Sequence, residues 1–255
     1  MVEAVIFDWA GTTVDFGCFA PVQAFIETFK AAGVEPTMAE TREPMGMLKI
    51  DHIRAMLKMP RIEAEWVRVH GAAPTEDDVQ ALYAPYEERL LSILHDFAAP
   101  KPCALECIAR LREAGVKIGT TTGYNDKMME IVVPAAREAG YDPDFVITPD
   151  GVGGYGRPYP YMVFRNLEAL GVRDVRNVVK VGDTVSDIRE GLCAGVRSIG
   201  VAEGSSVMGL TQAEYEALDP AEQDAACERT TCVLREAGAM DVVRNLSELP
   251  GLLGL

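Results

Sequence analysis

The sequence predicts an α/β fold, in which a doubly wound, Rossmann-like parallel sheet carries an inserted helical cap domain. Strand and helix patterns alternate along the second half of the chain, and this βαβα order is typical of a parallel sheet with helices on both faces. A first apolar strand pattern ends at Asp8, and residues of roughly 17–97 then show helical spacing without a convincing strand. We therefore expect a core domain from residues 1–16 and 98–255 and a helical cap domain from residues 17–97.

Local patterns predict the first strand and the helices of the cap. Val5, Ile6 and Phe7 form a short apolar run that suits a strand buried on both faces. Thr75 followed by Asp78 gives an approximate capping box for the last cap helix. A Pro-rich stretch breaks the helical pattern, and we interpret it as a hinge. The cap helices are expected over 22–32, 47–59, 62–69 and 75–97, and the hinge over 98–102.

Beyond the hinge the chain is expected to alternate between helix and strand. Helices are predicted over 105–114, 127–139, 161–170 and 186–194. Strands are predicted over 116–122, 144–148, 177–181 and 196–201. The acidic tail over 210–238 is predicted to be helical, and it is followed by a short strand over 240–243 and a helix from Ser247.

Composition excludes several classes of protein. The 255 residues include 39 acidic side chains against 24 Lys and Arg, a formal net charge of −15, which argues against nucleic acid and anionic membranes as partners. No apolar run approaches membrane-spanning length, and no basic leader precedes the first strand pattern. The six cysteines contain no CxxC pair, so we expect free thiols rather than a zinc site, in a cytoplasmic protein.

Polar residues follow the ends of four predicted strands. Parallel sheets bind their ligands at this edge, beyond the carboxyl ends of the strands. Hydroxyls and backbone N–H groups at a helix start can hold an anion, a guanidinium can grip two oxygens, and paired carboxylates can hold Mg²⁺. Alone, each of these residues has an ordinary explanation as a cap, a surface ion pair or a solvated turn. In chain order they are Asp8, then Thr122, Gly123 and Tyr124, then Arg157, and finally Asp183 with Asp187.

Taken together, in this order and at strand ends, these motifs resemble the haloacid dehalogenase-like superfamily of phosphotransferases. The resemblance implies that Asp8 attacks phosphorus and forms an aspartyl-phosphate intermediate. It also implies a Mg²⁺ ion held by Asp8, the backbone carbonyl of Ala10 and Asp183, with Asp187 beside them. Such an ion would neutralise phosphoryl oxygens that otherwise repel the attacking carboxylate.

Two departures from the common superfamily pattern refine the prediction. Most phosphatases of the group carry a second Asp two residues after the nucleophile, where this chain has Ala10. A methyl group cannot donate a proton, so hydrolysis of an ordinary phosphate ester lacks its general acid. The position after the third strand usually carries a Lys, whereas here Arg157 is the better candidate. The Gly-rich stretch 150–156 before it leaves the reach of Arg157 open.

A predicted cap helix carries a second group of reactive side chains. Met45, Lys49, His52 and Met56 recur at i, i+4, i+7 and i+11, so a helix places them on one face. The simple alternative is that Lys49 extends to solvent and His52 is a satisfied surface histidine.

The stretches 8–15, 44–52, 156–160, 180–187 and 204–206 closely resemble the phosphonoacetaldehyde hydrolases, also called phosphonatases. The resemblance covers nearly the whole chain, and the cap motif is specific to that family within the superfamily. It implies that Lys49 forms a Schiff base with the substrate aldehyde, while His52 helps proton transfers. Supporting roles around the imine are implied for Cys18, Met45, Gly46 and Tyr124.

Such a reaction explains Ala10. A C–P bond has no leaving oxygen to protonate, whereas a protonated imine on the adjacent carbon can accept the electron pair. The products would be acetaldehyde and phosphate. Lys49 must attack as a free amine, so we expect desolvation and nearby positive charge to lower its pKa. The resemblance also suggests a homodimer, and we expect the helix face near Phe25, Ile26 and Phe29 to pair two caps.

Two alternatives stay open at this point. The chain could be a sugar-phosphate phosphatase or phosphomutase of the same superfamily, although Ala10 weighs against it. It could also be a non-catalytic module that binds phosphate or metal on the same fold.

Overall fold

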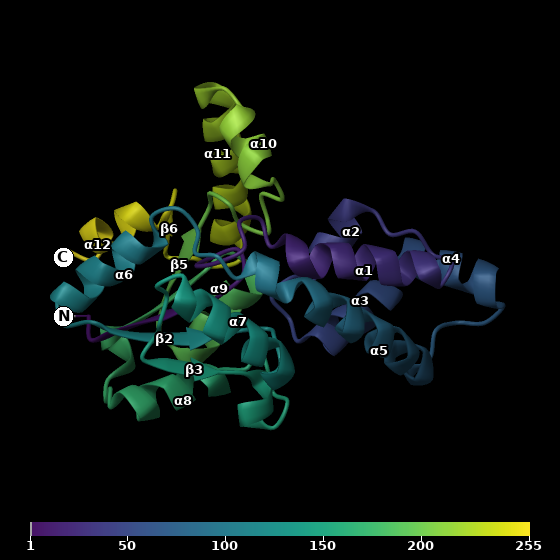
Figure 1. Cartoon of the computed structure of the whole chain (residues 1–255), viewed down its shortest axis with the longest axis horizontal. Helices are drawn as coiled ribbons and strands as arrows, with labels where there is room; N and C mark the ends of the chain where they lie inside the picture. The colour runs from purple at the N-terminus through teal and green to yellow at the C-terminus, as the bar shows by residue number, and fades with distance from the viewer. Residues whose placement is uncertain (1) are drawn as a thin grey trace.

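In the computed structural model, which describes residues 2–255, six strands form one parallel sheet in the order β3-β2-β1-β4-β5-β6 (Figure 1). The strands are β1 (Ala4–Phe7), β2 (Lys117–Thr121), β3 (Phe145–Ile147), β4 (Val178–Gly182), β5 (Arg197–Val201) and β6 (Asp241–Val243). The central strand β1 pairs with β4, and Phe7 lies opposite Val181. Because both strands run in the same direction, their carboxyl ends lie side by side at one edge of the sheet.

Helices cover both faces of the sheet, which confirms the predicted doubly wound α/β fold. Alternate residues of β1 point to opposite sides: Val5 belongs to one apolar cluster and Ile6 to another. The cluster with Val5 includes residues of α6 (Ala104–Glu113), α7 (Asp126–Glu138) and α12 (Leu249–Leu252). The cluster with Ile6 includes residues of α8 (Tyr161–Leu170) and α9 (Val185–Ala194). Burial on both faces explains why β1 is a continuous apolar run rather than an alternating one.

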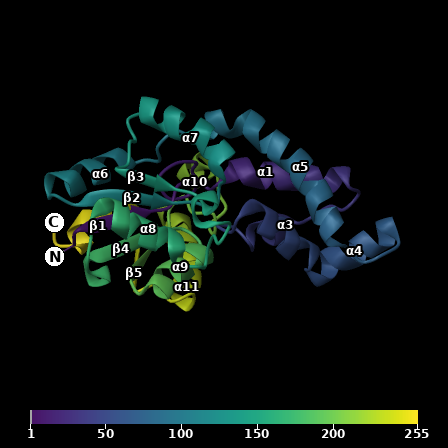
Figure 2. The same cartoon turned by 90° about the horizontal axis from the view of Figure 1, so that it is seen from below.

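The chain from α1 to η1, between β1 and α6, is helical and forms a lobe beside the sheet, as Figures 1 and 2 show. We call this lobe the cap. In it α1 packs on α5, and α3 also packs on α5. Its helices are α1 (Phe19–Ala31), α2 (Met38–Arg42), α3 (Lys49–Leu57), α4 (Pro60–His70) and α5 (Glu76–Ile93), followed by the 3₁₀ turn η1 (Leu94–Phe97).

All four predicted cap helices begin one to three residues from the expected position, and the short helix α2 was not predicted. Helix α1 starts at Phe19, three residues before the expected 22, because the Asp15 carboxylate accepts hydrogen bonds from the N–H groups of Phe19 and Ala20. Helix α3 starts at Lys49 rather than 47. Gly46 has φ +85°, a left-handed conformation that no right-handed helix contains, so Met45 lies before the helix and not on its face. The predicted Thr75–Asp78 capping box is confirmed.

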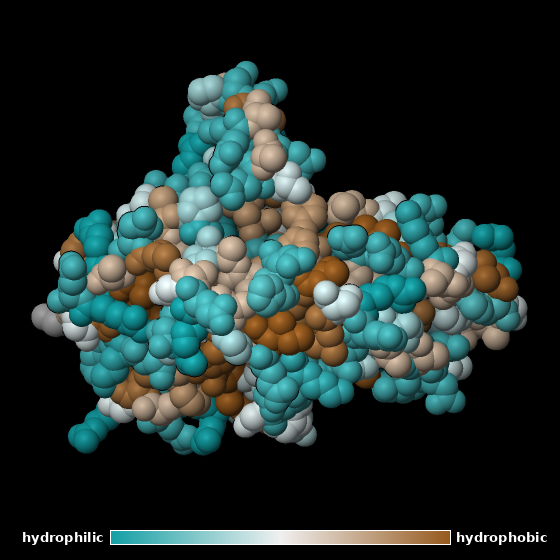
Figure 3. Space-filling view, in the orientation of Figure 1, coloured by the Kyte–Doolittle hydropathy of each residue, from teal (hydrophilic) through white to brown (hydrophobic). Residues whose placement is uncertain are grey.

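The tail divides into two helices, where one helical stretch was predicted. Helix α10 (Gln212–Ala217) ends before Leu218, and α11 (Pro220–Glu236) begins with its own capping box from Asp219. Both helices project from the sheet lobe (Figure 1), and hydrophilic residues cover most of their visible surface in Figure 3. The three short 3₁₀ turns of the core are η2 (Pro149–Val152), η3 (Val175–Asn177) and η4 (Leu246–Glu248).

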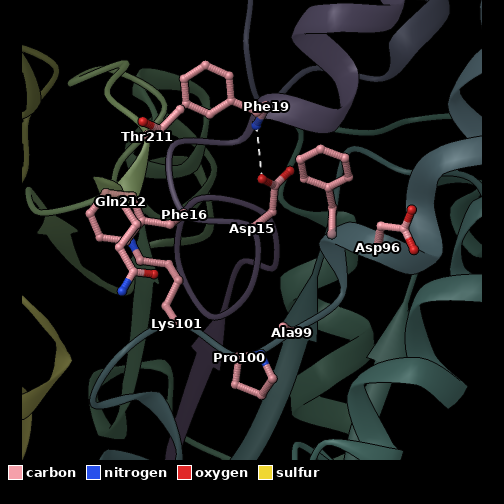
Figure 4. Close-up of a pocket in the computed structure, with 10 residues that line it drawn as sticks. Asp15, Phe16, Phe19, Asp96, Ala99, Pro100, Lys101, Thr211 and Gln212 are labelled. Atoms are coloured by element: carbon pink, nitrogen blue, oxygen red, sulfur yellow. Dashed lines mark hydrogen bonds between the residues drawn. The ribbon is translucent and has the colours of Figure 1, made fainter. Parts of the chain in front are cut away.

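Two segments connect the sheet lobe to the cap, one after β1 and one before α6, and backbone hydrogen bonds join them. Lys101 N–H donates to the Thr13 carbonyl, and Val14 forms an antiparallel bridge with Pro100. A cavity of about 250 Å³ opens beside this crossing, and Figure 4 shows Asp15 and Lys101 on its walls with three phenylalanines nearby. Burial raises the pKa of Asp15 to about 7, although hydrogen bonds from Phe19 and Ala20 oppose the shift.

The Lys101 side chain links three loops of the core. Its Nζ donates to the main-chain carbonyls of Gly11, Glu203 and Gly204. Burial lowers the pKa of Lys101 to about 8, against the attraction of nearby carboxylates. The second connection is thereby tied both to the loop after β1 and to the loop after β5.

Three other expectations can be compared with the structure. All six cysteines are free thiols. Within residues 2–255, no helix combines the length and the apolar character needed to cross a membrane. The expected pairing face on α1 is wrong in its detail, because the side chains of Phe25 and Phe29 are fully buried inside their own cap.

An aromatic stack at the centre of the cap gives the first testable prediction. The Phe25 ring stacks on His52 at 3.9 Å and on Tyr86 at 4.1 Å. Phe25→Leu should lower the free energy of unfolding by about 1–3 kcal/mol, because two aromatic contacts are lost. Urea denaturation measures the change. Phe164→Leu, at an exposed position, serves as the control and should stay within about 0.5 kcal/mol of the wild type. Equal stability of the two variants would contradict the prediction.

Candidate active site

The residues predicted at the strand ends meet at one edge of the sheet. Asp8 follows β1 and Asp183 follows β4, and both carboxylates are buried. Thr12 joins them: its hydroxyl donates to Asp183 Oδ1 at 2.8 Å and lies 3.4 Å from Asp8 Oδ2. The backbone N–H of Ser206 donates to the other Asp183 oxygen at 2.6 Å. Two fixed donors therefore hold Asp183 in one orientation.

Asp187 lies on the first turn of α9 and completes the acidic group. Its carboxylate caps the helix through Thr184, and Lys180 Nζ donates to its Oδ1 at 2.7 Å. Carboxylate oxygens of Asp8, Asp183 and Asp187 all lie within 4.8 Å of one another. Hard divalent cations prefer a set of oxygen ligands of this kind.

The electrostatic surroundings of these three carboxylates also favour binding of a cation. Burial, and then the carboxylates of Asp8 and Asp187, raise the pKa of Asp183 to about 8. Burial opposes ionisation of Asp187 too, but Arg157 and Lys180 outweigh it and lower the pKa of that carboxyl. A buried carboxylate that takes up a proton for lack of positive charge is a good ligand for an added cation. The residues present therefore fit a divalent metal ion.

Arg157 reaches Asp8, so the Gly-rich stretch before it does not keep the guanidinium away from the strand ends. Its Nη2 donates to Asp8 Oδ1 at 2.6 Å and to Thr121 Oγ1 at 2.9 Å. Its Nη1 lies 3.1 Å from Asp187, and its Nε donates to Glu190 at 3.0 Å. Burial alone would lower the pKa of Arg157, but the carboxylates of Asp187, Asp8 and Glu190 raise it, so the guanidinium stays charged.

The cap contributes a buried amine that faces this group. Lys49 is 3% exposed, so the alternative of a lysine extended into solvent is excluded. Its Nζ lies 5.1 Å from the centre of the Tyr124 ring. Burial lowers the pKa of Lys49 below its ordinary value of 10.5, and Arg157 adds to the shift while Cys18 and Asp8 oppose it. The predicted direction of the shift is confirmed, with desolvation as its main cause.

His52 is buried on the same cap helix, one turn after Lys49. Burial, with the Lys49 charge as a second cause, holds the pKa of His52 well below 6.5, so the ring is neutral. Nε2 lies 2.8 Å from the Thr41 carbonyl, which can only accept, so Nε2 carries the proton. Nδ1 then holds a lone pair and has no hydrogen-bond partner.

A small cavity lies between the cap and the core. Its volume is about 10 Å³, roughly the room that one water molecule needs. The predicted residues Met45, His52, Asp183 and Asp187 are not on its walls. The lining residues are Asp8, Ala10, Cys18, Gly46, Lys49, Thr122, Gly123, Tyr124, Arg157 and Thr184.

Two glycines allow the cap to approach this closely. A Cβ on Gly46 would collide with the Thr184 hydroxyl, and one on Gly123 would lie 2.6 Å from the Met47 carbonyl. Hydrogen bonds also cross the boundary: Ser186 donates to the Met45 carbonyl at 3.1 Å. The loop before α3 is therefore packed against the strand ends.

Four further predicted site residues, Cys18, Tyr124, Met45 and Thr122, lie around the cavity or pack behind it. Burial raises the pKa values of the Cys18 thiol and the Tyr124 phenol well above their ordinary ranges, so both side chains are neutral. The Met45 side chain is buried in the apolar core. Thr122 Oγ1 accepts a hydrogen bond from Tyr124 N–H at 3.1 Å, which shapes the turn after β2.

The roles of several residues that hold the site together were not predicted from the sequence. Lys180 had a visible signal, because a lysine inside the apolar run 178–181 needs a buried partner. Glu190 had another, since it follows Asp187 by three residues on a predicted helix. Thr12 and Ser206 lie in stretches that carry the family resemblance, but their contacts, like those of Lys101, depend on how the loops fold and could not be predicted.

Family comparisons agree with this geometry. A family model described as haloacid dehalogenase-like hydrolase matches residues 2–195 of the chain. An aspartate after the first strand, with further carboxylates after β4, is the arrangement that the sequence resemblance implied. The protein is thus an enzyme of the haloacid dehalogenase-like hydrolase class.

Relatives that match almost the whole chain identify the family within this class of hydrolases. Phosphonoacetaldehyde hydrolase of Lysinibacillus sphaericus is 52% identical over 252 residues, covering 99% of this chain and 94% of that protein. A bifunctional phosphonoacetaldehyde hydrolase/aminoethylphosphonate transaminase of Clostridioides difficile is 51% identical, and this chain spans 40% of its length. The crystal structure of a phosphonoacetaldehyde hydrolase-like protein from Oleispira antarctica, 38% identical, matches with a TM-score of 0.96 over 99% of this chain and 91% of that one. The chain belongs to the phosphonoacetaldehyde hydrolase family.

Binding of a divalent cation should depend on pH. Below about pH 8 Asp183 holds a proton that a cation must displace, so affinity should rise with pH by up to about tenfold per unit. The melting temperature should therefore increase more on addition of MgCl₂ at pH 8 than at pH 6. Asp183→Asn should abolish the increase, whereas Asp77→Asn, on the exposed surface of α5, should keep it. An Asp183→Asn variant that responds to MgCl₂ like the wild type would exclude this metal site.

Proposed function

We propose that the protein hydrolyses the C–P bond of phosphonoacetaldehyde to acetaldehyde and phosphate. One observation carries the proposal: the Lys49 amine of the cap and the Asp8 carboxylate of the core line the same small cavity. Ala10 lines it as well, where most phosphatases of the superfamily carry the acid that an ester needs. The names of the relatives support the choice of substrate.

Lys49 supplies the electron sink in this proposal. Its neutral amine attacks the aldehyde carbon, and loss of water gives an imine that is protonated on nitrogen. A carbanion leaves poorly, but the protonated imine accepts the electron pair of the breaking C–P bond, so the two-carbon fragment departs as an enamine. Protonation of its terminal carbon and addition of water to the iminium then release acetaldehyde and restore the amine.

Asp8 captures the phosphoryl group. A carboxylate oxygen attacks phosphorus while the C–P bond breaks, and water then hydrolyses the aspartyl-phosphate to phosphate. Arg157, at 2.6 Å from Asp8, is well placed to hold phosphoryl oxygens through charged hydrogen bonds. Thr122 and Gly123, at the start of the turn after β2, line the same cavity and are proposed to contact the phosphonate.

We propose Mg²⁺ as the cofactor, held by Asp8, the Ala10 carbonyl and Asp183, with Asp187 beside them. Bound there, it would neutralise oxygens that otherwise repel the attacking carboxylate.

His52 is proposed to move protons while the imine forms. Its fixed Nε2–H leaves Nδ1 as an acceptor, and the neutral ring can take up a proton from the reacting amine or from water. Cys18, Gly46 and Tyr124 line the cavity and are proposed to enclose the imine, with Met45 packed behind them.

The cap must open to admit substrate. A cavity of about 10 Å³ cannot contain phosphonoacetaldehyde, and this small volume supports a closed arrangement of the two lobes. Closure excludes water from the amine and the carboxylate during the reaction.

The assembly and location of the protein are also proposals. A cytoplasmic homodimer that contacts its partner through the caps is our expectation, using residues other than the buried Phe25 and Phe29. Light scattering on the purified protein would reveal a monomer if the dimer is wrong.

Borohydride trapping tests the proposed chemistry. Reduction in the presence of phosphonoacetaldehyde should attach a two-carbon or phosphonoethyl adduct to the peptide that contains Lys49, as measured by mass spectrometry. Lys49→Arg should abolish the adduct and C–P cleavage, because a guanidinium forms no imine. Lys58→Arg, at the exposed end of the same helix, should retain both. C–P cleavage by Lys49→Arg would contradict the imine mechanism, whereas hydrolysis of a phosphate ester that survives in Lys49→Arg would favour a simple phosphatase. Full activity of Asp8→Asn would rule out either enzyme.

The pH dependence of kcat/KM should follow the free amine. Activity should rise with pH as Lys49 loses its proton, and burial moves that ionisation below 10.5. Stopped-flow or steady-state assays from about pH 5 to about pH 10 would reveal the rise. A profile without any ionisation below that of an ordinary lysine would contradict the role of burial.

A further inference from the structure

We propose that Glu190 is a positioning residue, which, together with Lys180, fixes the plane of the Arg157 guanidinium so that it faces Asp8. This inference rests on the proposed function, since it concerns the same phosphoryl transfer. Neither Glu190 nor Lys180 takes part in the mechanism derived above, yet both are completely buried.

Each nitrogen of the guanidinium has a carboxylate partner. Nη2 donates to Asp8 at 2.6 Å, Nη1 lies 3.1 Å from Asp187, and Nε donates to Glu190 at 3.0 Å. A planar group held at Nε and Nη1 has only one direction left for Nη2. Glu190 thereby determines where the third nitrogen points, although it does not line the cavity itself.

Helix α9 presents the two outer carboxylates together. Asp187 and Glu190 are three residues apart, so they lie on the same face of the helix. A Cβ on Gly191 would lie 3.0 Å from Lys180 Cβ, so the missing side chain lets α9 pack closely on β4. This close packing fixes the distance from Glu190 to Arg157 by the position of a helix rather than by a loop.

Lys180 balances the two carboxylates. Its Nζ donates to Asp187 at 2.7 Å and lies 3.6 Å from Glu190 Oε2. The same Glu190 oxygen also accepts from Thr121 at 2.8 Å, while its other oxygen has no hydrogen-bond partner. Burying a carboxylate with one unsatisfied oxygen is unfavourable for stability. Such a residue is therefore better explained by its contact with Arg157 than by packing.

An arginine at position 157 needs a partner such as Glu190 to fix its orientation. A lysine has a single nitrogen at its tip and no Nε–H to orient, whereas an arginine presents donors along one edge and can rotate about its terminal bonds. Donors that are fixed before phosphoryl transfer begins stabilise the transition state without reorganisation. Loss of Glu190 should consequently lower kcat more than it changes KM.

Two variants separate the reach of the side chain from its charge. Glu190→Asp keeps the charge but withdraws the carboxylate by one methylene, and it should lower kcat about 10- to 100-fold, because small misplacements of a reacting group are costly. Glu190→Gln keeps an oxygen at the same reach and should recover most of the lost kcat. Glu168→Asp, at an exposed ion pair on α8, is the matched control and should behave like the wild type. Melting temperatures establish that each variant is folded.

A double-mutant cycle distinguishes positioning from general stability. In an Arg157→Lys background, Glu190→Asp should cause little further loss of kcat, because the Nε–H that it orients is absent. If the losses instead multiply, or if Glu190→Asp matches the wild type in kcat, the proposal is overturned. Should Glu190→Asp fail to fold, the pair Lys180→Met/Glu190→Ala and Lys180→Met/Glu190→Gln replaces it. The variant with Ala should have the lower kcat, because it has no oxygen left to orient the Nε–H of Arg157, and equal kcat values would overturn the proposal.

Orthovanadate with MgCl₂ provides a readout that does not depend on C–P cleavage. Vanadate adopts the five-coordinate geometry of a transferring phosphoryl group, so calorimetry should give weaker binding to Glu190→Asp than to the wild type, by about tenfold or more. Equal affinity would overturn the positioning role. A wild-type protein that binds vanadate but does not cleave phosphonoacetaldehyde would contradict the proposed function while leaving this inference intact.

Discussion

The ion pair between Arg157 and Asp8 is the interaction on which the rest of the site depends. Both side chains are buried, and a buried charge is costly to stability unless an opposite charge and hydrogen bonds accompany it. The same guanidinium also contacts Asp187 and Glu190, so one cation serves three carboxylates. Asp183 is left with too little positive charge nearby, and for this reason a divalent cation suits the group.

The sheet and the cap build this site in different ways. Parallel pairing of β1 with β4 brings Thr12 to Asp183, although 171 residues separate them in the sequence. The cap contributes Lys49, and Gly46 and Gly123 permit the close approach of the cap to the strand ends. Because burial is the main cause of its lowered pKa, the shift of Lys49 depends on the packing of the cap onto the core. Closure and activation of the amine are thus expected to occur together.

Most of the elements could be predicted because their signals are local. Each expected strand lies within one or two residues of its observed bounds, since apolar runs bounded by turns depend on neighbouring residues alone. Helix starts were less predictable. The start of α1 depends on a hydrogen bond from Phe19 to Asp15, and the start of α3 depends on the left-handed backbone of Gly46. Burial of Phe25 inside the cap depends on packing against α3 and α5, which no local pattern reveals.

By itself, the sequence determined the class of fold and the order of the motifs at the strand ends. These follow from periodicity and from residue types that chemistry requires in a given order. Only the tertiary structure decided that Lys49 is buried, that Arg157 reaches Asp8, and that Lys180 and Glu190 support that contact. Burial and ion pairing depend on distances between segments far apart in the chain, and such distances exist only after the sheet has formed and the cap has packed onto it.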